Sequence, residues 1–348
     1  MNAVIRWIVA IVVTALAPAG AWAAGEHPLF ASDDMIQVTI KGPVSTVART
    51  GGKPSDPKPA TIAGPGSPDA LPIVLAPRGL SRRAGEMCRF GPLRVEFTQP
   101  PPANSIFAHQ KKLKLVTHCR PQENFQQYLL LEYAAYKLYN VLTPNSFKVR
   151  LATVNYVQEN GKPLISRLGF FIEDTDDAAK RNGMHEAKVG ARIAASQLSP
   201  RDAARESLFQ YMISNLDWAL VAGPAGESCC HNTKLVGPAP GNANQLVPIP
   251  YDFDLSGFVD PPYAFPPESL PVTSVKDRLY RGYCIHNAQA LAVASEFRAR
   301  RSQLRAVLDS IPQLDTSTRR DGLGFLEGFF NQLGADGSTP SFLKGCLN

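Results

Sequence analysis

Four oxygen-bearing side chains in the second half of the chain are candidates for a single site that binds a divalent cation. They are Asp217, Asn232, Asp252 and Asp254. Asp252 and Asp254 fall on the same side of an extended segment, because side chains alternate along a strand. Carboxylate and amide oxygens are hard ligands that suit Mg²⁺ or Mn²⁺, and these ions bind phosphates. The pattern predicts that residues far apart in the sequence converge on a metal that holds a polyphosphate.

Phosphoryl transfer requires further groups around such a metal. Besides the metal ligands, it uses an aspartate that orients the acceptor hydroxyl and a lysine on the phosphates that pairs with a helix glutamate. Lys114, on a strand-like segment, and Glu132, on the helix that follows, are candidates for this pair. Arg94 and Lys112 are rivals to Lys114 for the phosphate contact.

Ordinary structural roles remain open for the same residues. Asp217 could cap or end the preceding helix, and Asp252 with Asp254 could form an Asx turn or bind a structural calcium. Glu132 could hydrogen-bond a tyrosine hydroxyl, since a helix would place it on an aromatic face where a carboxylate needs a partner. Lys114 could be a solvated strand residue. The sequence contains no nucleophile elbow, P-loop or H-E-x-x-H motif.

The first half of the chain has the pattern of a sheet with one long helix. Alternating apolar and β-branched residues predict short strands, which suggest an antiparallel sheet. The predicted strands are 35–41, 71–76, 92–97, 112–118, 146–156 and 163–172. Asn160-Gly161 is a hairpin signal between the last two strands. Residues 125–142 contain no Pro or Gly and have apolar residues at helical spacing, which predicts an amphipathic helix. Residues 42–70 are rich in Gly, Pro, Ser and Ala, which predicts a flexible insertion.

Helices dominate the second half. Ser199 is a candidate N-cap, with Pro200 at the first helical position, for a helix that runs to about Leu216. Residues 232–236 and 245–251 predict a short β pair, whose second strand is confined to an edge by its two prolines. Two further helices are expected near 288–308 and 316–333.

Several motifs in this order resemble the CotH-like atypical kinases, a family first recognised among spore-coat proteins. The resemblance covers about residues 71–310. The motifs are Arg78-Gly79-Leu80-Ser81-Arg82, Leu131-Glu132-Tyr133-Ala134-Ala135-Tyr136-Lys137-Leu138, Leu168-Gly169-Phe170-Phe171-Ile172-Glu173, Asn215-Leu216-Asp217 with Asn232, and Pro250-Tyr251-Asp252-Phe253-Asp254.

The resemblance implies an α+β fold of the two-lobed, atypical protein-kinase-like type, with nucleotide bound between the lobes. The β-rich N-lobe would span residues 28–175 and the helical C-lobe residues 176–348. Asp217 would then be the catalytic residue that orients the acceptor, while Asn232 and Asp252, with Asp254 beside them, would hold the metal. Arg78 would lie over the phosphates, in place of a glycine-rich loop.

The expected function is that of a phosphotransferase that uses ATP, or another nucleoside triphosphate, with Mg²⁺ or Mn²⁺. The acceptor would be a hydroxyl on an exported protein or envelope component. Two alternatives remain open: a non-catalytic kinase-like module that binds an envelope partner, and a calcium-stabilised adhesin domain. The sequence also leaves open whether a phosphoryl or a nucleotidyl group is transferred.

The N-terminus predicts export. Residues 1–23 have a basic residue at Arg6, a short apolar run, and small residues that favour cleavage near Ala23. The mature protein is therefore expected to be periplasmic or secreted, with no membrane span after signal removal. Six cysteines in an oxidising compartment favour disulfides, with the pairing open, while a metal site at Cys229, Cys230 and His231 is an alternative.

The net charge argues against a nucleic-acid partner. The chain has 36 Lys and Arg against 30 Asp and Glu, a formal charge of +6. These basic residues do not form a long block, and no aromatic-basic RNA-binding pattern is present. A hydrophobic content of 44% excludes a wholly disordered chain.

Overall fold

The computed structural model describes residues 27–49, 56–67, 69–79, 87–335 and 337–348. The predicted signal segment, 1–23, and the Leu80-Ser81-Arg82 part of the basic turn lie outside the described residues.

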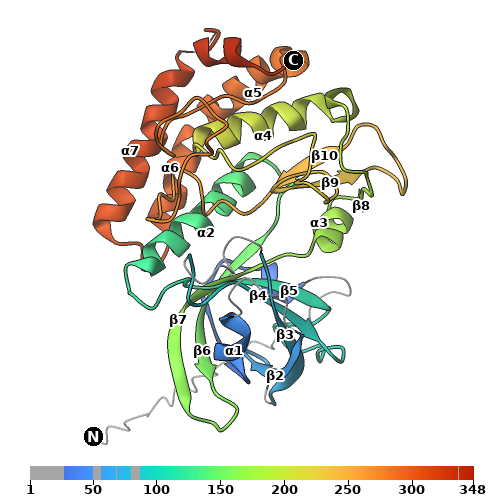
Figure 1. The fold of residues 1–348 in the computed structure, drawn as a ribbon, viewed down its shortest axis with the longest axis vertical. Helices are drawn as coiled ribbons and strands as arrows, with labels where there is room; N and C mark the ends of the chain where they lie inside the picture. The colour runs from blue at the N-terminus through green and yellow to red at the C-terminus, as the bar shows by residue number, and fades with distance from the viewer. Residues whose placement is uncertain (1–26, 50–55, 68, 80–86, 336) are drawn as a thin grey trace, which may run out of the picture.

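Seven strands form a closed barrel, which lies at one end of the molecule (Figure 1). They are β1 (Ile36–Lys41), β2 (Lys58–Ala63), β3 (Leu71–Pro77), β4 (Leu93–Phe97), β5 (Lys112–Val116), β6 (Val149–Val157) and β7 (Pro163–Ile172). Their order around the barrel is β1-β2-β3-β4-β5-β7-β6. Neighbouring strands pair antiparallel, except that β1 pairs parallel with β6, from Ile36 opposite Ala152 to Lys41 opposite Val157.

The closed barrel shows that the expected two-lobed kinase-like fold is wrong. Alternate residues of each strand point inward, so that side chains such as Val38, Val95, Leu115 and Phe171 fill the barrel with its own apolar core. The parallel contact between β1 and β6 removes both free edges of the sheet. Strand periodicity predicted most of the strands, but it carries no information about which distant strands pair.

The segment 42–70 also differs from its prediction. Instead of forming only an exposed insertion, it contains the helix α1 (Val44–Ala48) and the strand β2. Val44 and Val47 are buried on the barrel core, and β2 pairs with both β1 and β3. Composition suggested a loop, but tertiary pairing ordered this stretch as part of the barrel.

The remaining elements form a helical layer and a small sheet. The α-helices are α2 (Phe125–Leu142), α3 (Thr175–Arg181), α4 (Pro200–Met212), α5 (Asn287–Ala299), α6 (Arg301–Ser310) and α7 (Thr316–Leu333). Short 3₁₀ helices are η1 (Pro28–Phe30), η3 (Ala195–Gln197), η4 (Cys284–His286) and η5 (Ser341–Gly345). The three-stranded sheet has the order β10-β9-β8, from β8 (His185–Glu186), β9 (Thr233–Gly237) and β10 (Val247–Pro250). The predicted helix 125–142, the Ser199 N-cap position and the β9–β10 pair are confirmed.

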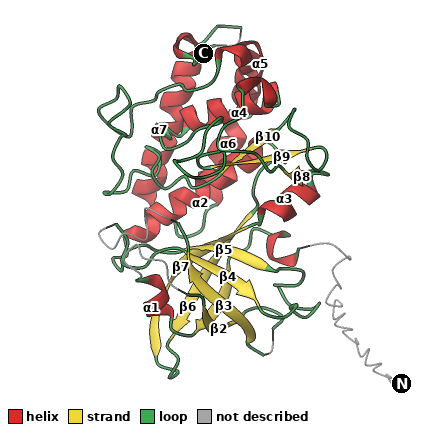
Figure 2. Cartoon of the chain, turned by 45° about the vertical axis from the view of Figure 1, so that its right-hand side comes forward, coloured by secondary structure: helices red, strands yellow, loops and turns green. Residues whose placement is uncertain are grey.

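Helix α2 connects the barrel to the helical layer, as Figure 2 shows. Its buried residues share one hydrophobic core with the outer face of β7 and with the later helices: Leu130, Phe170 and Phe209 belong to the same cluster. This continuous core fixes α2 between the strands and the loops that follow α4 and β10. Glu132 and Tyr136 on α2 are therefore held in a rigid frame.

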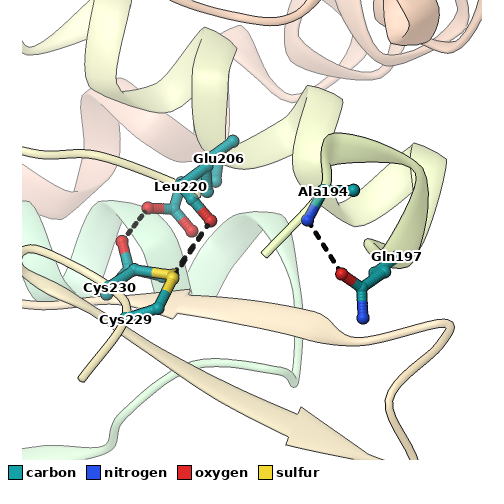
Figure 3. The surroundings of a disulfide bond; sticks show 7 residues. Ala194, Gln197, Glu206, Leu220, Cys229 and Cys230 are labelled. Atoms are coloured by element: carbon teal, nitrogen blue, oxygen red, sulfur yellow. Dashed lines mark hydrogen bonds between the residues drawn. A yellow bond between two sulfur atoms is a disulfide. The ribbon is translucent and has the colours of Figure 1, made fainter. Parts of the chain in front are cut away.

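All six cysteines form disulfides within the described residues: Cys88–Cys119, Cys229–Cys230 and Cys284–Cys346. Figure 3 shows the Cys229–Cys230 pair, whose Cys230 sulfur lies 2.9 Å from the carbonyl oxygen of Leu220. The alternative of a metal held by these two thiolates is excluded, because both sulfurs are used in the disulfide. No helix among the described residues has both the length and the apolar character that crossing a bilayer requires. These features are compatible with an exported protein.

Candidate metal and phosphate site

Three carboxylates meet at the junction between α2 and the segment after β10. Glu132, Asp252 and Asp254 each have an oxygen that lies within 4.8 Å of the others. Glu132 is 2% exposed and Asp254 5% exposed. Carboxylates this close repel one another, and a divalent cation is a ligand that all three can share. A cavity of about 10 Å³ borders Glu132 and Asp254, which is roughly the room that one water-sized particle needs.

The backbone around Asp252 explains how these carboxylates come together. Asp252 has a φ of +64°, and its N–H donates to the hydroxyl of Tyr136 at 2.9 Å. Tyr136 lies one turn beyond Glu132 on α2, so the same helix face fixes the backbone of Asp252 and supplies the third carboxylate. Phe253 points into the core against Tyr136, with ring centroids 4.6 Å apart. Its neighbours Asp252 and Asp254 both belong to the carboxylate cluster with Glu132.

Asp217 forms a second polar cluster. It lies beyond Ile213, the C-cap of α4, so it does not cap that helix. One of its carboxylate oxygens is 2.6 Å from Nε2 of His231, and the other accepts a hydrogen bond of 3.0 Å from Nδ2 of Asn232. Its own N–H donates to Oδ1 of Asn215 at 3.1 Å. The hydrogen bond with Asp217 raises the pKa of His231 above its ordinary value.

The two clusters adjoin one another through Tyr251. The N–H of Tyr251 donates to the carbonyl oxygen of Asn232 at 3.0 Å, which places Asp252 directly beside Asn232. Asp252 also contributes, after Asp217, to the raised pKa of His231. The side-chain nitrogen of Asn232 is bound to Asp217, so its Oδ1 is directed away from Asp217.

Three cations, Lys114, Lys234 and Arg78, lie near Tyr251. Lys114 on β5 lies 5.5 Å from the centroid of its ring, and Lys234 on β9 lies 5.9 Å from it. Burial, and then the charge of Arg78, lower the pKa of Lys114 to about 7, and Lys234 acts in the same direction. Arg78 has a buried guanidinium nitrogen, NH1, with no hydrogen-bond partner among the residues that the structure describes. Cations forced this close together form a strong site for an anion.

The four oxygen-bearing side chains that were expected to share one site lie in two groups. Asp217 contacts Asn232, and Asp252 lies with Asp254. Glu132 groups with these two aspartates, whereas the acids that act on the pKa of Lys114 are Asp174 and Glu186.

The two rivals to Lys114 have acidic partners of their own. Lys112 is 3.6 Å from Asp174, and Arg94 is 3.8 Å from Glu96. Both lie on the same outer face of the barrel as Lys114, which is opposite Arg94 in the β4–β5 register. Their ion pairs leave Lys114 as the better candidate for a phosphate contact.

Sequence reasoning missed two members of the site. Lys234 follows Asn232 by two residues, and this spacing along a strand could have indicated that both face the same side. His231 was considered as a metal ligand beside Cys229 and Cys230, whereas the structure bonds it to Asp217. No local pattern could have shown that its partner is the candidate catalytic carboxylate.

Of two larger cavities, one reaches the site. One of about 320 Å³ is lined by Asp217, His231 and Arg281, among other residues. Another, of about 1050 Å³, lies between the barrel and α3, and none of the three clustered carboxylates lines it. Some of its charged residues form ion pairs, as Arg181 does with Glu173 and Lys112 with Asp174. The smaller cavity is therefore the one that reaches the polar cluster.

Comparison with known proteins adds no further assignment. No protein-family model matches this chain, and no curated protein matches it. The function of this site has to be argued from the geometry and chemistry of its own residues.

Proposed function

We propose that this protein is a phosphotransferase that uses ATP or another nucleoside triphosphate with Mg²⁺ or Mn²⁺. One observation carries the proposal: Lys114 and Lys234 lie by the ring of Tyr251, Arg78 acts on the same tyrosine, and the next residue, Asp252, belongs to the cluster of three carboxylates. A nucleoside triphosphate is polyanionic and is used together with a divalent cation. A site that offers cations to the phosphates and carboxylates to the metal can bind the nucleotide and the divalent cation together.

Each charged group has a separate role in this proposal. Lys114, Lys234 and Arg78 hold the phosphates. Glu132, Asp252 and Asp254, with Oδ1 of Asn232, hold the metal, and all four supply the oxygen ligands that Mg²⁺ and Mn²⁺ prefer. When bound, the metal neutralises the charge that develops on the phosphate oxygens.

Asp217 is the residue that binds the acceptor hydroxyl. Its carboxylate is fixed from two sides, by His231 and Asn232, and is 35% exposed, so an incoming hydroxyl can reach it. Asp217 orients this hydroxyl and accepts its proton. The hydroxyl oxygen then bonds to the γ-phosphorus while the bond to the departing diphosphate breaks. Most of the rate enhancement comes from positioning and charge neutralisation.

The expected setting is outside the cytoplasm. The predicted signal at 1–23 and the three disulfides support a periplasmic or secreted protein. The acceptor would accordingly be an exported protein or an envelope component. The motif resemblance to CotH-like kinases points to the same chemistry, and membership of that family remains a prediction.

Transfer of labelled phosphate tests the proposal. The wild-type protein, incubated with γ-labelled ATP and Mn²⁺, should label itself or release labelled phosphate. Asp217→Asn and Asp252→Asn should each lower this rate about 100-fold or more, because each removes a charge needed in the transition state. Asp321→Asn, an exposed position on α7, is the matched control and should keep the wild-type rate.

Folding of the variants should be checked by circular dichroism and thermal melting. The proposal is wrong if folded Asp217→Asn or Asp252→Asn matches the Asp321→Asn control. It is also wrong if the wild-type protein binds nucleotide but neither hydrolyses nor transfers its phosphate, since that behaviour describes a binding module.

A further inference from the structure

The cavity next to Asp217 has the position expected of an acceptor site, an inference that rests on the proposed phosphotransferase function. Its volume is about 320 Å³. Asp217 and His231 line one part of it, Trp218 and Pro224 provide apolar walls, and Pro267 and Leu270 belong to a loop on another side. A group that enters this space meets the carboxylate that the proposed function assigns to proton transfer.

Arg281 places a positive charge in the wall of this cavity. Its NH1 donates to the carbonyl oxygen of Leu216 at 2.8 Å, and its guanidinium lies 5.7 Å from the ring centroid of Trp218. Within the described part of the chain, no carboxylate lies within 4.0 Å of Arg281 to form an ion pair. A guanidinium has five N–H donors in a fixed plane, and its geometry matches a carboxylate. Arg281 is therefore oriented by its neighbours and keeps donors for an acidic ligand.

An exposed aromatic residue lies near the rim of the cavity. Phe265 is 77% exposed and is two residues from Pro267, which lines the cavity. Among the described large hydrophobic residues it is the most exposed. Exposed aromatic side chains beside a pocket are common anchors for polypeptide partners. This position favours an acceptor that continues beyond the cavity as a chain and not an isolated small molecule.

We propose that this cavity binds an acidic polypeptide acceptor. The acceptor's serine or threonine hydroxyl lies at Asp217, a neighbouring Asp or Glu carboxylate pairs with Arg281, and an apolar side chain contacts Phe265. In the transfer step, the hydroxyl proton passes to Asp217, a new bond joins its oxygen to the γ-phosphorus, and a nucleoside diphosphate leaves. The formal charge of +6 assists the approach of an acidic partner.

Peptide binding followed by tryptophan fluorescence tests this inference separately from catalysis. Trp218 lines the cavity and is the only tryptophan that follows the predicted signal. Two serine peptides should be compared that differ only in their flanking residues, Glu in one and Gln in the other. The Glu peptide should change the fluorescence and bind about tenfold more tightly, the effect of one charge-assisted pair.

Variants then locate the contact. Arg281→Gln should remove the preference for the Glu peptide, and Phe265→Ala should weaken both peptides equally. Arg320→Gln is the matched control, since Arg320 is exposed on α7. Equal binding of the two peptides by the wild-type protein, or an unchanged preference in folded Arg281→Gln, would overturn the inference.

The same experiment separates this inference from the proposed function. If the Glu peptide binds with the predicted dependence on Arg281 but receives no phosphate, the acidic-peptide site stands and the phosphotransferase function fails. If phosphate is transferred equally to both peptides, the function stands and the acidic preference is wrong.

Discussion

Lys114 is held in surroundings that oppose its charge. It lies 5.1 Å from the ring centroid of Phe147 and 5.5 Å from that of Tyr251, with Arg78 and Lys234 nearby. Burial and these cations bring its pKa down to about 7. A polyphosphate favours the ammonium form, so binding would restore the proton.

Nucleotide binding should therefore take up protons. At pH 8 Lys114 is mostly neutral in the free protein, and binding of ATP with Mg²⁺ should take up close to one proton, about 0.9 for a pKa of 7. Titration calorimetry in buffers with different ionisation enthalpies measures this number. Lys114→Met should abolish the uptake, whereas Lys112→Met, on the same strand face, should retain it. Equal heats in all buffers for the wild-type protein would contradict this role of Lys114.

For single residues, the type of side chain indicated which groups could form the site, but it did not show which neighbours would surround each group. The donor types of Asp217, Asn232, Asp252 and Asp254 were sufficient to suggest that they converge, and the structure places them in two adjoining clusters. The grouping of Glu132 with the aspartates depends on how α2 packs against the segment after β10. The sequence of α2 alone does not determine that contact.

A buried network ties helix α4 to strand β9 beneath the Asp217 loop. Thr233 on β9 donates to Oε1 of Glu206 on α4, and Gln210 donates to the same oxygen at 3.4 Å. Asn215 donates to Gln210 at 3.0 Å and accepts from the N–H of Asp217. Glu206 is 0% exposed, and burial raises its pKa to about 8. At neutral pH this carboxyl group is protonated and the network carries no net charge.

Glu206→Gln should make the protein more resistant to rising pH. The folded pKa of Glu206 lies above its unfolded value of 4.5, so its contribution to stability is complete below about pH 4.5 and is lost as pH rises towards 8. Between these values the wild-type free energy of unfolding should fall, relative to Glu206→Gln, by about 1.4 kcal/mol per pH unit.

Urea unfolding at pH 5, 6.5 and 8 would measure this effect. The exposed substitution Glu123→Gln serves as the matched control and should follow the wild type. If the stabilities of wild type and Glu206→Gln change in parallel across this range, Glu206 is not the neutral buried group described above.

Helices and strands were predicted correctly where residues close together in the sequence determine them. Helix α2 has the predicted bounds because residues 125–142 contain neither Pro nor Gly. Helix α7 matches 316–333 although it contains three glycines, and its start is fixed by Asp315, whose side chain accepts from the N–H of Thr318. The helix expected over 288–308 is divided at Arg300 into α5 and α6. Strand β2 was missed because its proline and two alanines have little strand propensity, and its pairing with β1 and β3 decides its conformation.

At the scale of the whole molecule, the architecture depends on contacts that are remote in sequence. The parallel pairing of β1 with β6 closes the barrel, and the core around Leu130 and Phe170 joins that barrel to the helical layer. Neither contact has a local signal, which is why the fold class was predicted incorrectly. The charged site lies where this layer meets the outer face of β5. Its integrity therefore depends on the barrel as well as on the helices.

Thermal melting with nucleotide and metal tests the central claim most directly. A ligand that binds only the folded state stabilises it, by about 2.7 kcal/mol at a concentration of 100 Kd. ATP with Mn²⁺ should raise the Tm of the wild-type protein, while adenosine with Mn²⁺, or Ca²⁺ alone, should not. Glu132→Gln should lose the part of the rise that requires Mn²⁺. An unchanged Tm with ATP and Mn²⁺, or a rise with Ca²⁺ alone, would contradict a site for a metal and a polyphosphate.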